Sequence, residues 1–207
     1  MNKTKMLNEM KSHPMKRKII FAINITIDGF ADHTAVIADD ELHDFYTDLL
    51  NTVDMVLFGR KTYQLLESFW PIAHEDPGST KSMLKFADKI NSMPKIVFSN
   101  TLNEVHWNNT SLVKGNMVEE ILKLKNQPGN NLSIGGLSIA SHLTKLGLID
   151  EYFFLVQPII LGTGTPLFGN LSDRVDLKLI DTKIFYSGVV AKHYQKIKRD
   201  NLYINKQ

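Results

Sequence analysis

Short runs rich in β-branched residues alternate with amphipathic stretches along the first three quarters of the chain. Residues 19–27 form such a run, which stops at the turn-forming pair Asp28-Gly29 and is typical of a buried strand. From Leu42 to Val53, apolar residues recur at steps of three and four, which indicates a helix with one buried face. Acidic residues at 39–41 suit the positive amino-terminal end of that helix.

The same alternation continues to about residue 147. The patterns predict strands at 55–58, 95–98, 111–113 and 131–134, and helices at 61–69, 82–90, 118–124 and 138–146. Trp70-Pro71 ends the first of these helices, and the polar segment that follows as far as Gly78 is predicted to be a loop. Gly147 is suited to end the last one.

The last quarter of the chain carries strand patterns only. Residues 151–160, 175–185 and 189–197 show no helical period between them, and Tyr186-Ser187-Gly188 forms a turn between the last two. Alternating strands and helices are typical of a parallel sheet, to which a terminal hairpin adds antiparallel strands. The prediction is an α/β fold with a mostly parallel central sheet, helices on both faces and an antiparallel C-terminal hairpin.

Composition is that of one ordinary globular domain. The chain has 207 residues, of which 43% are hydrophobic and 22% charged, and this length is enough for a single sizeable core. Residues 15–200 are assigned to the domain, residues 1–14 to a polar amino-terminal appendage and residues 201–207 to a tail. The alternative for residues 1–14 is a short helix that packs on the fold or on a partner.

Charge and cysteine content exclude several classes of protein. The 24 basic and 22 acidic residues leave a net charge of +2, too small to indicate a nucleic-acid or membrane surface. The lack of cysteine excludes disulfides and thiolate chemistry, and the histidines do not form a metal-binding motif, so no metal is expected. No apolar run reaches the ~20 residues of a membrane span, and the lysine-rich start does not resemble a secretory signal. A cytoplasmic enzyme or binding protein is expected.

Two turns from a strand into a helix have the chemistry of an anion site. The first, Gly59-Arg60-Lys61-Thr62, combines a helix amino terminus with two cationic side chains and a hydroxyl. The second, Ile134-Gly135-Gly136-Leu137, has two glycines that let a ligand approach the backbone closely. Each turn, taken alone, could instead be an ordinary helix start or a tight turn.

Other strand ends carry further candidates. Ser99 and Asn100 follow the third strand and could hydrogen-bond a phosphate or a ribose, or simply cap a loop. Asp28 follows the first strand and could face a pocket or support a turn. Trp70 could form the wall of a substrate pocket or belong to the core. The chain has neither the G-x-G-x-x-G fingerprint nor a P-loop.

Together and in this order, the motifs resemble the dihydrofolate-reductase-like superfamily. The closer resemblance is to stand-alone reductase domains related to the C-terminal reductase of bifunctional riboflavin biosynthesis enzymes. It spans about residues 16–198 and rests on Thr26-Ile27-Asp28-Gly29, Gly59-Arg60-Lys61-Thr62-Tyr63, Phe98-Ser99-Asn100, Ile134-Gly135-Gly136 and the segment PIILGTGTPLF at 158–168. The resemblance implies the three-layer α/β sandwich of that superfamily and a reductase that uses NADPH.

The resemblance also implies roles for single residues. Arg60 with Ser99 or Asn100 would hold the adenosine 2′-phosphate, Thr62 and the backbone of 135–137 the pyrophosphate, and Ala22 or Ile23 would lie beside the nicotinamide. The full implied cofactor-binding set is Ala22, Ile23, Gly59, Arg60, Lys61, Thr62, Ser99, Asn100, Gly135, Gly136 and Leu137. Asp28 and Trp70 would stand on the substrate side, where Asp28 would orient a donor or relay a proton through water.

The implied reaction is hydride transfer from NADPH to a small C=N or C=O substrate. Deamination is excluded because the cysteines of a zinc deaminase are missing. Folate reduction is not expected, since neither Asp40 nor Asp44 falls at the step where dihydrofolate reductases place their acid. The relatives suggest a homodimer, for which residues 152–161 are a candidate interface.

Two other functions stay open. The protein could bind NADPH or a pterin-like ligand without turnover, or act as an interaction protein through residues 1–14.

Overall fold

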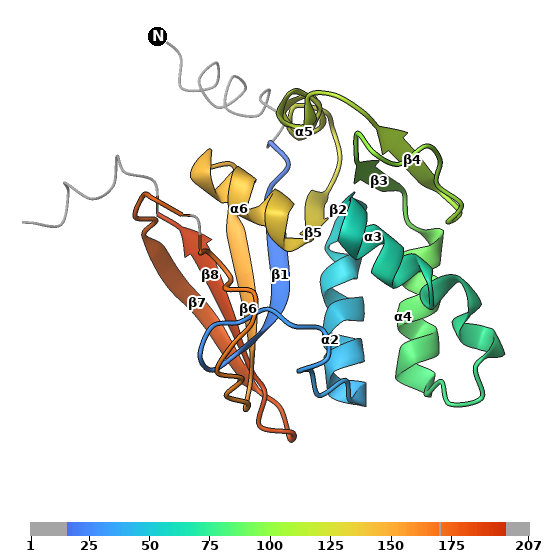
Figure 1. The fold of residues 1–207 in the computed structure, drawn as a ribbon, viewed down its shortest axis with the longest axis vertical. Coiled ribbons are helices and arrows are strands. Elements are labelled where there is room, and N and C mark those ends of the chain that lie inside the picture. Colours follow the sequence, from blue (N-terminus) through green and yellow to red (C-terminus); the bar gives the residue numbers. More distant parts are fainter. Residues whose placement is uncertain (1–15, 170, 198–207) are drawn as a thin grey trace, which may run out of the picture.

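The computed structural model describes residues 16–169 and 171–197, in which eight strands form one sheet (Figure 1). Its strand order is β4-β3-β2-β5-β1-β6-β8-β7. The strands are β1 (Ile19–Thr26), β2 (Val53–Gly59), β3 (Lys95–Phe98), β4 (Thr110–Val113), β5 (Asn131–Gly135), β6 (Glu151–Gln157), β7 (Leu177–Ile184) and β8 (Val190–Lys196). The predicted appendage (1–14) and tail (201–207) lie outside the described residues, as do residues 15 and 198–200 of the predicted domain.

The direction of the strands confirms the predicted α/β class. β1 lies between β5 and β6 and pairs with both in parallel, and the parallel arrangement continues through β2 and β3 to β4. β8 is antiparallel to both β6 and β7, so the C-terminal hairpin closes one edge of the sheet. The carboxyl ends of six strands therefore meet at one edge, where ligands of such sheets bind.

Helices cover both faces of the sheet, as the apolar patterns predict. The helices are α2 (Asp40–Asn51), α3 (Arg60–Glu67), α4 (Lys81–Ser92), α5 (Met117–Lys125) and α6 (Leu137–Lys145), with a short 3-10 helix, η1 (Trp70–Glu75). On one face, Ile121 of α5 and Leu143 of α6 pack against Phe21 of β1. On the other, Leu49 of α2 and Phe86 of α4 share a core with Ile20 of β1. Side chains that alternate along β1 therefore pack into two different cores, one on each face of the sheet.

Three segments differ from the sequence prediction. The strand predicted to run to residue 160 ends at Gln157, because Pro158 has no N–H to continue the ladder. Where a loop was predicted after Trp70, the chain forms η1, with Pro71 in its first turn. The candidate interface at 152–161 is wrong in large part, since β6 lies inside the sheet with Tyr152 and Leu155 buried.

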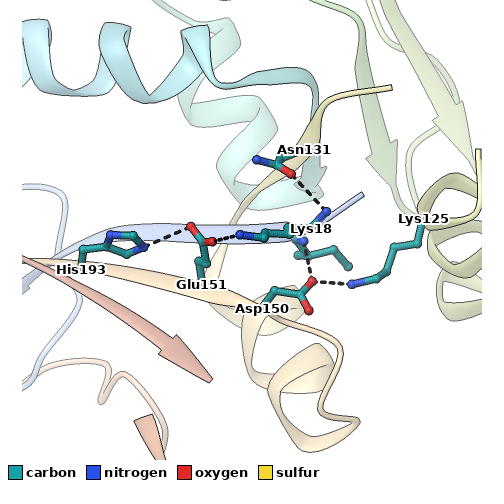
Figure 2. A network of polar contacts seen from close by, with 7 residues as sticks. Lys18, Lys125, Asn131, Asp150, Glu151 and His193 are labelled. Carbon is teal, nitrogen blue, oxygen red and sulfur yellow. Dashed lines mark hydrogen bonds and ion pairs between the residues drawn. The ribbon is translucent and has the colours of Figure 1, made fainter. Parts of the chain in front are cut away.

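A polar network fastens the amino-terminal edge of the sheet, opposite the carboxyl edge (Figure 2). It joins the starts of β1, β5 and β6 to α5 and β8 through Lys18, Lys125, Asn131, Asp150, Glu151 and His193. Glu151 accepts from Lys18 Nζ at 2.7 Å and contacts His193 Nε2 at 3.1 Å, while Asp150 accepts from the backbone N–H of Ile19 at 2.8 Å. These contacts fix the register at which β1 enters the sheet.

Lys95, the first residue of β3, is a buried cation. It is 1% exposed, and its ammonium donates to the carbonyls of Ile90 at 2.9 Å, Asn91 at 3.3 Å and Met93 at 2.8 Å. It also lies 4.7 Å from the centre of the Trp107 ring. Lys95 therefore supplies hydrogen bonds to carbonyls at and just after the end of α4, where the helix itself provides no donor. Burial lowers the pKa of Lys95 to about 8.

Replacing Lys95 by methionine is expected to lower the free energy of unfolding at pH 7 by about 2–3 kcal/mol, because buried carbonyls lose their donor. The native state releases the Lys95 proton near pH 8, whereas unfolded lysine releases it near 10.4. The wild type should therefore gain about 1–3 kcal/mol of stability relative to the variant as the pH rises between these values. Urea unfolding at pH 7.5 and 10 measures both effects. Parallel pH dependence of the two proteins would contradict the second.

Candidate functional site

The carboxyl edge of the sheet carries an open cleft of about 360 Å³. Its lining comes from the ends of β2 and β3 and the starts of α3, α5 and α6: Gly59, Arg60, Lys61, Phe98, Met117, Ser138 and Ile139. The first three of these residues are in the predicted cofactor set. Sequence reasoning missed Met117, Ser138 and Ile139, although Ser138 stands only two residues after the predicted turn at Gly136.

The two helices that begin at this cleft beside the sheet centre lack a side-chain cap. In α2, α4 and α5, the side chains of Asp39, Thr80 and Asn116 accept a hydrogen bond from the first turn. In α3 and α6 the cap positions are Gly59 and Gly136, and neither helix has a side-chain cap bond. Their first N–H groups are therefore available to an anion, and the helix dipoles favour one.

The glycines bring these two helix starts together. Gly136 has φ +120°, and a Cβ placed on it would lie 2.9 Å from Thr62 Oγ1. A Cβ on Gly135 would lie 2.7 Å from the ring of Phe58. Only glycine fits at either position, and the Thr62 hydroxyl of α3 stands directly beside the start of α6. Because residues 135 and 136 carry no side chain, the backbone at the start of α6 stays uncovered and has no side-chain cap. Contact of this backbone, including Leu137 as the first residue of α6, with the pyrophosphate of a dinucleotide stays a prediction.

Positive charge gathers at the start of α3. Arg60 and Lys61 are both exposed, and neither makes an ion pair within residues 16–169 and 171–197. The guanidinium of Arg60 has only a long contact, 3.5 Å, to Oε1 of Gln64 on its own helix. Cations at the positive end of a helix are unfavourable unless an anion joins them. This arrangement therefore fits a phosphate-bearing ligand.

Ser99 and Asn100 both support the loop after β3. Ser99 Oγ accepts from the backbone N–H groups of Thr101 at 3.2 Å and Leu102 at 3.0 Å. Asn100 Oδ1 accepts from the N–H of Gly115 at 2.8 Å, which ties this loop to the one after β4. Both contacts agree with the loop-capping alternative. Contact with a 2′-phosphate stays a prediction for these residues, which follow Phe98 at the rim of the cleft.

Ala22 and Ile23 lie on opposite faces of β1. Ala22 packs with the core shared by α2 and α4, and Ile23 with the core shared by α5 and α6. Both are partly exposed and lie in the middle of the strand, where the fully buried residues 19–21 give way to the partly buried residues 22–25. Their predicted place beside a nicotinamide agrees with this position but is not tested by it.

Asp28 anchors a loop at the carboxyl edge. Its carboxylate accepts from Thr26 Oγ1 at 2.5 Å and from the backbone N–H groups of Gly162 at 2.7 Å and Leu161 at 3.1 Å. The Thr26 hydroxyl, and then the Gly162 N–H, lower the pKa of Asp28 below its usual value. At neutral pH, Asp28 is thus an ionised acceptor that ties the end of β1 to the segment 158–168. Its role toward a substrate stays a prediction.

Trp70 packs between helices. Its ring centre lies 4.5 Å from that of Phe86 and 5.9 Å from that of His43, and its carbonyl accepts from Asn91 Nδ2 at 2.9 Å. The side chain belongs to the core on the α2–α4 side and is not part of the lining of the cleft. These contacts favour the core alternative for Trp70, and its substrate-facing role stays a prediction.

The described part of the chain shows neither a metal-binding cluster nor a membrane-spanning helix. It contains no group of three or more histidine, aspartate or glutamate side chains placed to hold a metal ion. Among the helices described, none has the length and apolar character that crossing a bilayer requires.

Comparison with known proteins agrees with this geometry. A family model described as the RibD C-terminal domain matches residues 17–191. The uncharacterized protein YyaP of Bacillus subtilis (strain 168) is 36% identical over 191 residues, which cover 89% of this chain and 98% of YyaP.

Solved structures show the same fold. A crystal structure named "Putative riboflavin biosynthesis protein", from Shewanella sp. PV-4, superposes with a TM-score of 0.68 at 25% identity, covering 87% of this chain and 99% of that one. A dihydrofolate reductase from Enterococcus faecalis, complexed with NADP(H) and RAB-propyl, superposes with a TM-score of 0.58 at 12% identity, covering 87% and 97%. The second shares the fold, and the predicted dihydrofolate-reductase-like architecture is confirmed.

Proposed function

The chain belongs to the RibD C-terminal domain family, and on this basis we propose that it is an NADPH-dependent reductase of small C=N or C=O substrates. One observation carries the proposal: two helix starts without a side-chain cap, and two cations with no ion pair in the described residues, converge on a cleft at the carboxyl edge of a parallel sheet. The NADP(H) complex of the dihydrofolate reductase with the same fold supports this choice of cofactor. The riboflavin-biosynthesis name of the Shewanella relative supports a heterocyclic substrate.

The residues of the cleft have separate tasks in this proposal. Arg60, with Ser99 or Asn100, holds the adenosine 2′-phosphate, since a guanidinium pairs well with phosphate oxygens. Thr62 and the backbone of residues 135–137 hold the pyrophosphate at the uncapped start of α6. Bound NADPH supplies the hydride, and the protein supplies orientation and a dry site.

On the substrate side, Asp28 and Trp70 have supporting roles and do not themselves take part in the reaction. Asp28 shapes the site by holding the loop at 158–168 through the N–H groups of Leu161 and Gly162. Trp70 supports the wall formed by α2 and α4 from within the core.

The proposal is tested by titrating the protein with NADPH and NADH, followed by nucleotide fluorescence and thermal shift. A micromolar Kd for NADPH and a Kd at least tenfold higher for NADH are expected, as discrimination by a 2′-phosphate site requires. Failure to bind either nucleotide would contradict the reductase function. Binding of NADPH without its consumption in the presence of pterins, flavin precursors and small imines would favour a binding protein instead.

We also propose that two copies associate through the free edge of the sheet. β7 is an edge strand, and Leu179, Ile180 and Ile184 are 51%, 46% and 73% exposed on it. Its outer backbone groups can pair with a second strand, and these three aliphatic side chains, interspersed with Lys178, Asp181 and Lys183, would lose exposed surface in the contact. Light scattering is expected to give about twice the mass of one chain, 23.5 kDa.

A further inference from the structure

A chain of hydrogen bonds joins four segments at the carboxyl end of β1. The backbone N–H of Ile37 donates to Gln157 Oε1 at 3.0 Å. Gln157 Nε2 donates to Asn24 Oδ1 at 2.9 Å, and Asn24 Nδ2 donates to the hydroxyl oxygen of Tyr46 at 3.1 Å. Gln157 is completely buried at the end of β6, while Tyr46 belongs to α2.

The direction of every bond in this chain is fixed by its first member. Amide oxygen and nitrogen atoms can often be exchanged in a structure, but a backbone N–H can only donate. Ile37 therefore requires the oxygen of Gln157, which turns the Gln157 amide nitrogen toward the oxygen of Asn24. The nitrogen of Asn24 then faces Tyr46, so the Tyr46 oxygen must accept. The hydrogen of the Tyr46 hydroxyl is left to point elsewhere.

Within the described residues, the Tyr46 hydroxyl has this one hydrogen bond, in which it accepts, and none that it donates. Burial raises the pKa of Tyr46 above its ordinary value, so the hydroxyl keeps its hydrogen at neutral pH. Tyr46 shares a cluster with Ala22 of β1, and Asn24 lies two residues further toward the carboxyl edge. Tyr46 therefore lies on the face of β1 that carries Ala22, one of the two residues predicted to lie beside the nicotinamide.

We propose that the Tyr46 hydroxyl donates a hydrogen bond to the heteroatom of the reducible group, the oxygen of a C=O or the nitrogen of a C=N. This inference rests on the proposed reductase function. The substrate carbon gains the hydride, the heteroatom gains a proton from water, and NADPH is oxidised by the same two electrons. Tyr46 stabilises the charge that develops on the heteroatom and keeps its own hydrogen.

The polarity of the chain also sets a substrate preference. The Tyr46 oxygen already accepts a hydrogen bond from Asn24. It is therefore a poor acceptor for an N–H or O–H group of a substrate. A group with a free lone pair, such as a carbonyl or an unprotonated imine, is complementary to the hydroxyl without rearrangement.

Three variants separate this role from a structural one. Tyr46→Phe removes the hydroxyl. Asn24→Asp keeps Tyr46 but replaces the donor with a carboxylate, which can only accept, so the hydroxyl turns and donates to residue 24. Tyr152→Phe is the matched control, because the Tyr152 hydroxyl donates to Thr144 Oγ1 at 3.3 Å within the opposite core.

The first readout does not depend on turnover. In protein labelled with ¹³Cζ-tyrosine, the NMR signal absent from Tyr46→Phe is that of Tyr46. We expect it to shift in Asn24→Asp, and to shift in the wild type when 7,8-dihydropterin (a C=N probe) or cyclohexanone (a C=O probe) is added with NADP+. The Tyr152 signal should stay in place. If the Tyr46 signal shifts in Asn24→Asp but with neither probe, the hydroxyl donates its hydrogen bond to water and not to a substrate, and the proposal is overturned.

The second readout is activity. For any carbonyl or imine compound that the wild type reduces, Tyr46→Phe and Asn24→Asp should each lower kcat/KM by about 10- to 100-fold, with the Kd of NADPH unchanged. Tyr152→Phe should retain the wild-type value. Wild-type kcat/KM in Tyr46→Phe would overturn the proposal. If NADPH does not bind at all, the reductase function fails, while the NMR comparison still decides the role of Tyr46.

Discussion

Replacement of Arg60 by alanine is expected to raise the Kd of NADPH by about 10- to 100-fold and to leave the Kd of NADH within twofold of the wild type. A charge-assisted hydrogen bond between a guanidinium and a phosphate contributes about 1.5–3 kcal/mol, and only NADPH carries the 2′-phosphate. Arg60 is exposed and has no ion pair in the described residues, so its removal should leave the fold intact. Fluorescence titration with both nucleotides measures the effect.

Two further arginine variants make the Arg60 experiment specific. Arg60→Lys keeps a point charge but loses the planar fork, so an intermediate loss of NADPH affinity is expected. Arg174→Ala is the control, because Arg174 is exposed and, in the described part of the chain, its side chain bonds only to Asp176 ahead of β7. Equal losses of NADPH and NADH affinity in Arg60→Ala would show that Arg60 contacts a part common to both nucleotides, and the 2′-phosphate assignment would be wrong.

Gly136→Ala is expected to weaken NADPH binding by at least about 100-fold, the largest effect we anticipate at this site. Its φ of +120° disfavours any side chain, and the new Cβ would meet Thr62 Oγ1 at 2.9 Å. Thr62 and the start of α6 must move apart, so the two groups proposed to hold the pyrophosphate no longer lie side by side. The free energy of unfolding should also fall, by about 1–3 kcal/mol.

The control for Gly136 is a glycine that also has a positive φ but no crowding. Gly188 has φ +85° in the β7–β8 turn, and a Cβ there would lie 3.7 Å from Pro158, an ordinary contact. Gly188→Ala should therefore lower stability while the Kd of NADPH stays unchanged. Comparable NADPH affinity in Gly136→Ala and Gly188→Ala would remove the pyrophosphate from the α6 start.

The secondary structure could be predicted from the sequence because each element carries its own period. The stripe from Leu42 to Val53 covers most of α2, although Val53 itself begins β2, and the run at 19–27 matches β1 to within one residue. The order of strands could not be predicted, since nothing local to residues 131–135 shows that β5 enters between β2 and β1. The apolar pattern also did not predict η1, because this helix is too short for the pattern to repeat.

The candidate site divides in the same way. The turns at 59–62 and 134–137 could be recognised because glycine and cations at a strand end are a local signal. Met117 and Ser138 could not, because they reach the cleft only through the packing of α5 and α6. Tyr46 reads in sequence as one more member of an apolar stripe. Its polar partners Asn24 and Gln157 sit inside strand runs, so the chain that orients it exists only in three dimensions.

The uncapped starts of α3 and α6 also bear on how this protein should be engineered. Methods that raise thermostability place serine or aspartate at helix caps and acidic residues in first turns. Applied at Gly59, Arg60 or Gly136, such changes would stabilise the protein without cofactor. They would also block the helix starts, or remove the positive charge, that the proposed cofactor site uses. The least optimised positions of the fold are thus the ones a stabilisation campaign should leave alone, while the capped helices and the amino-terminal edge remain open to it.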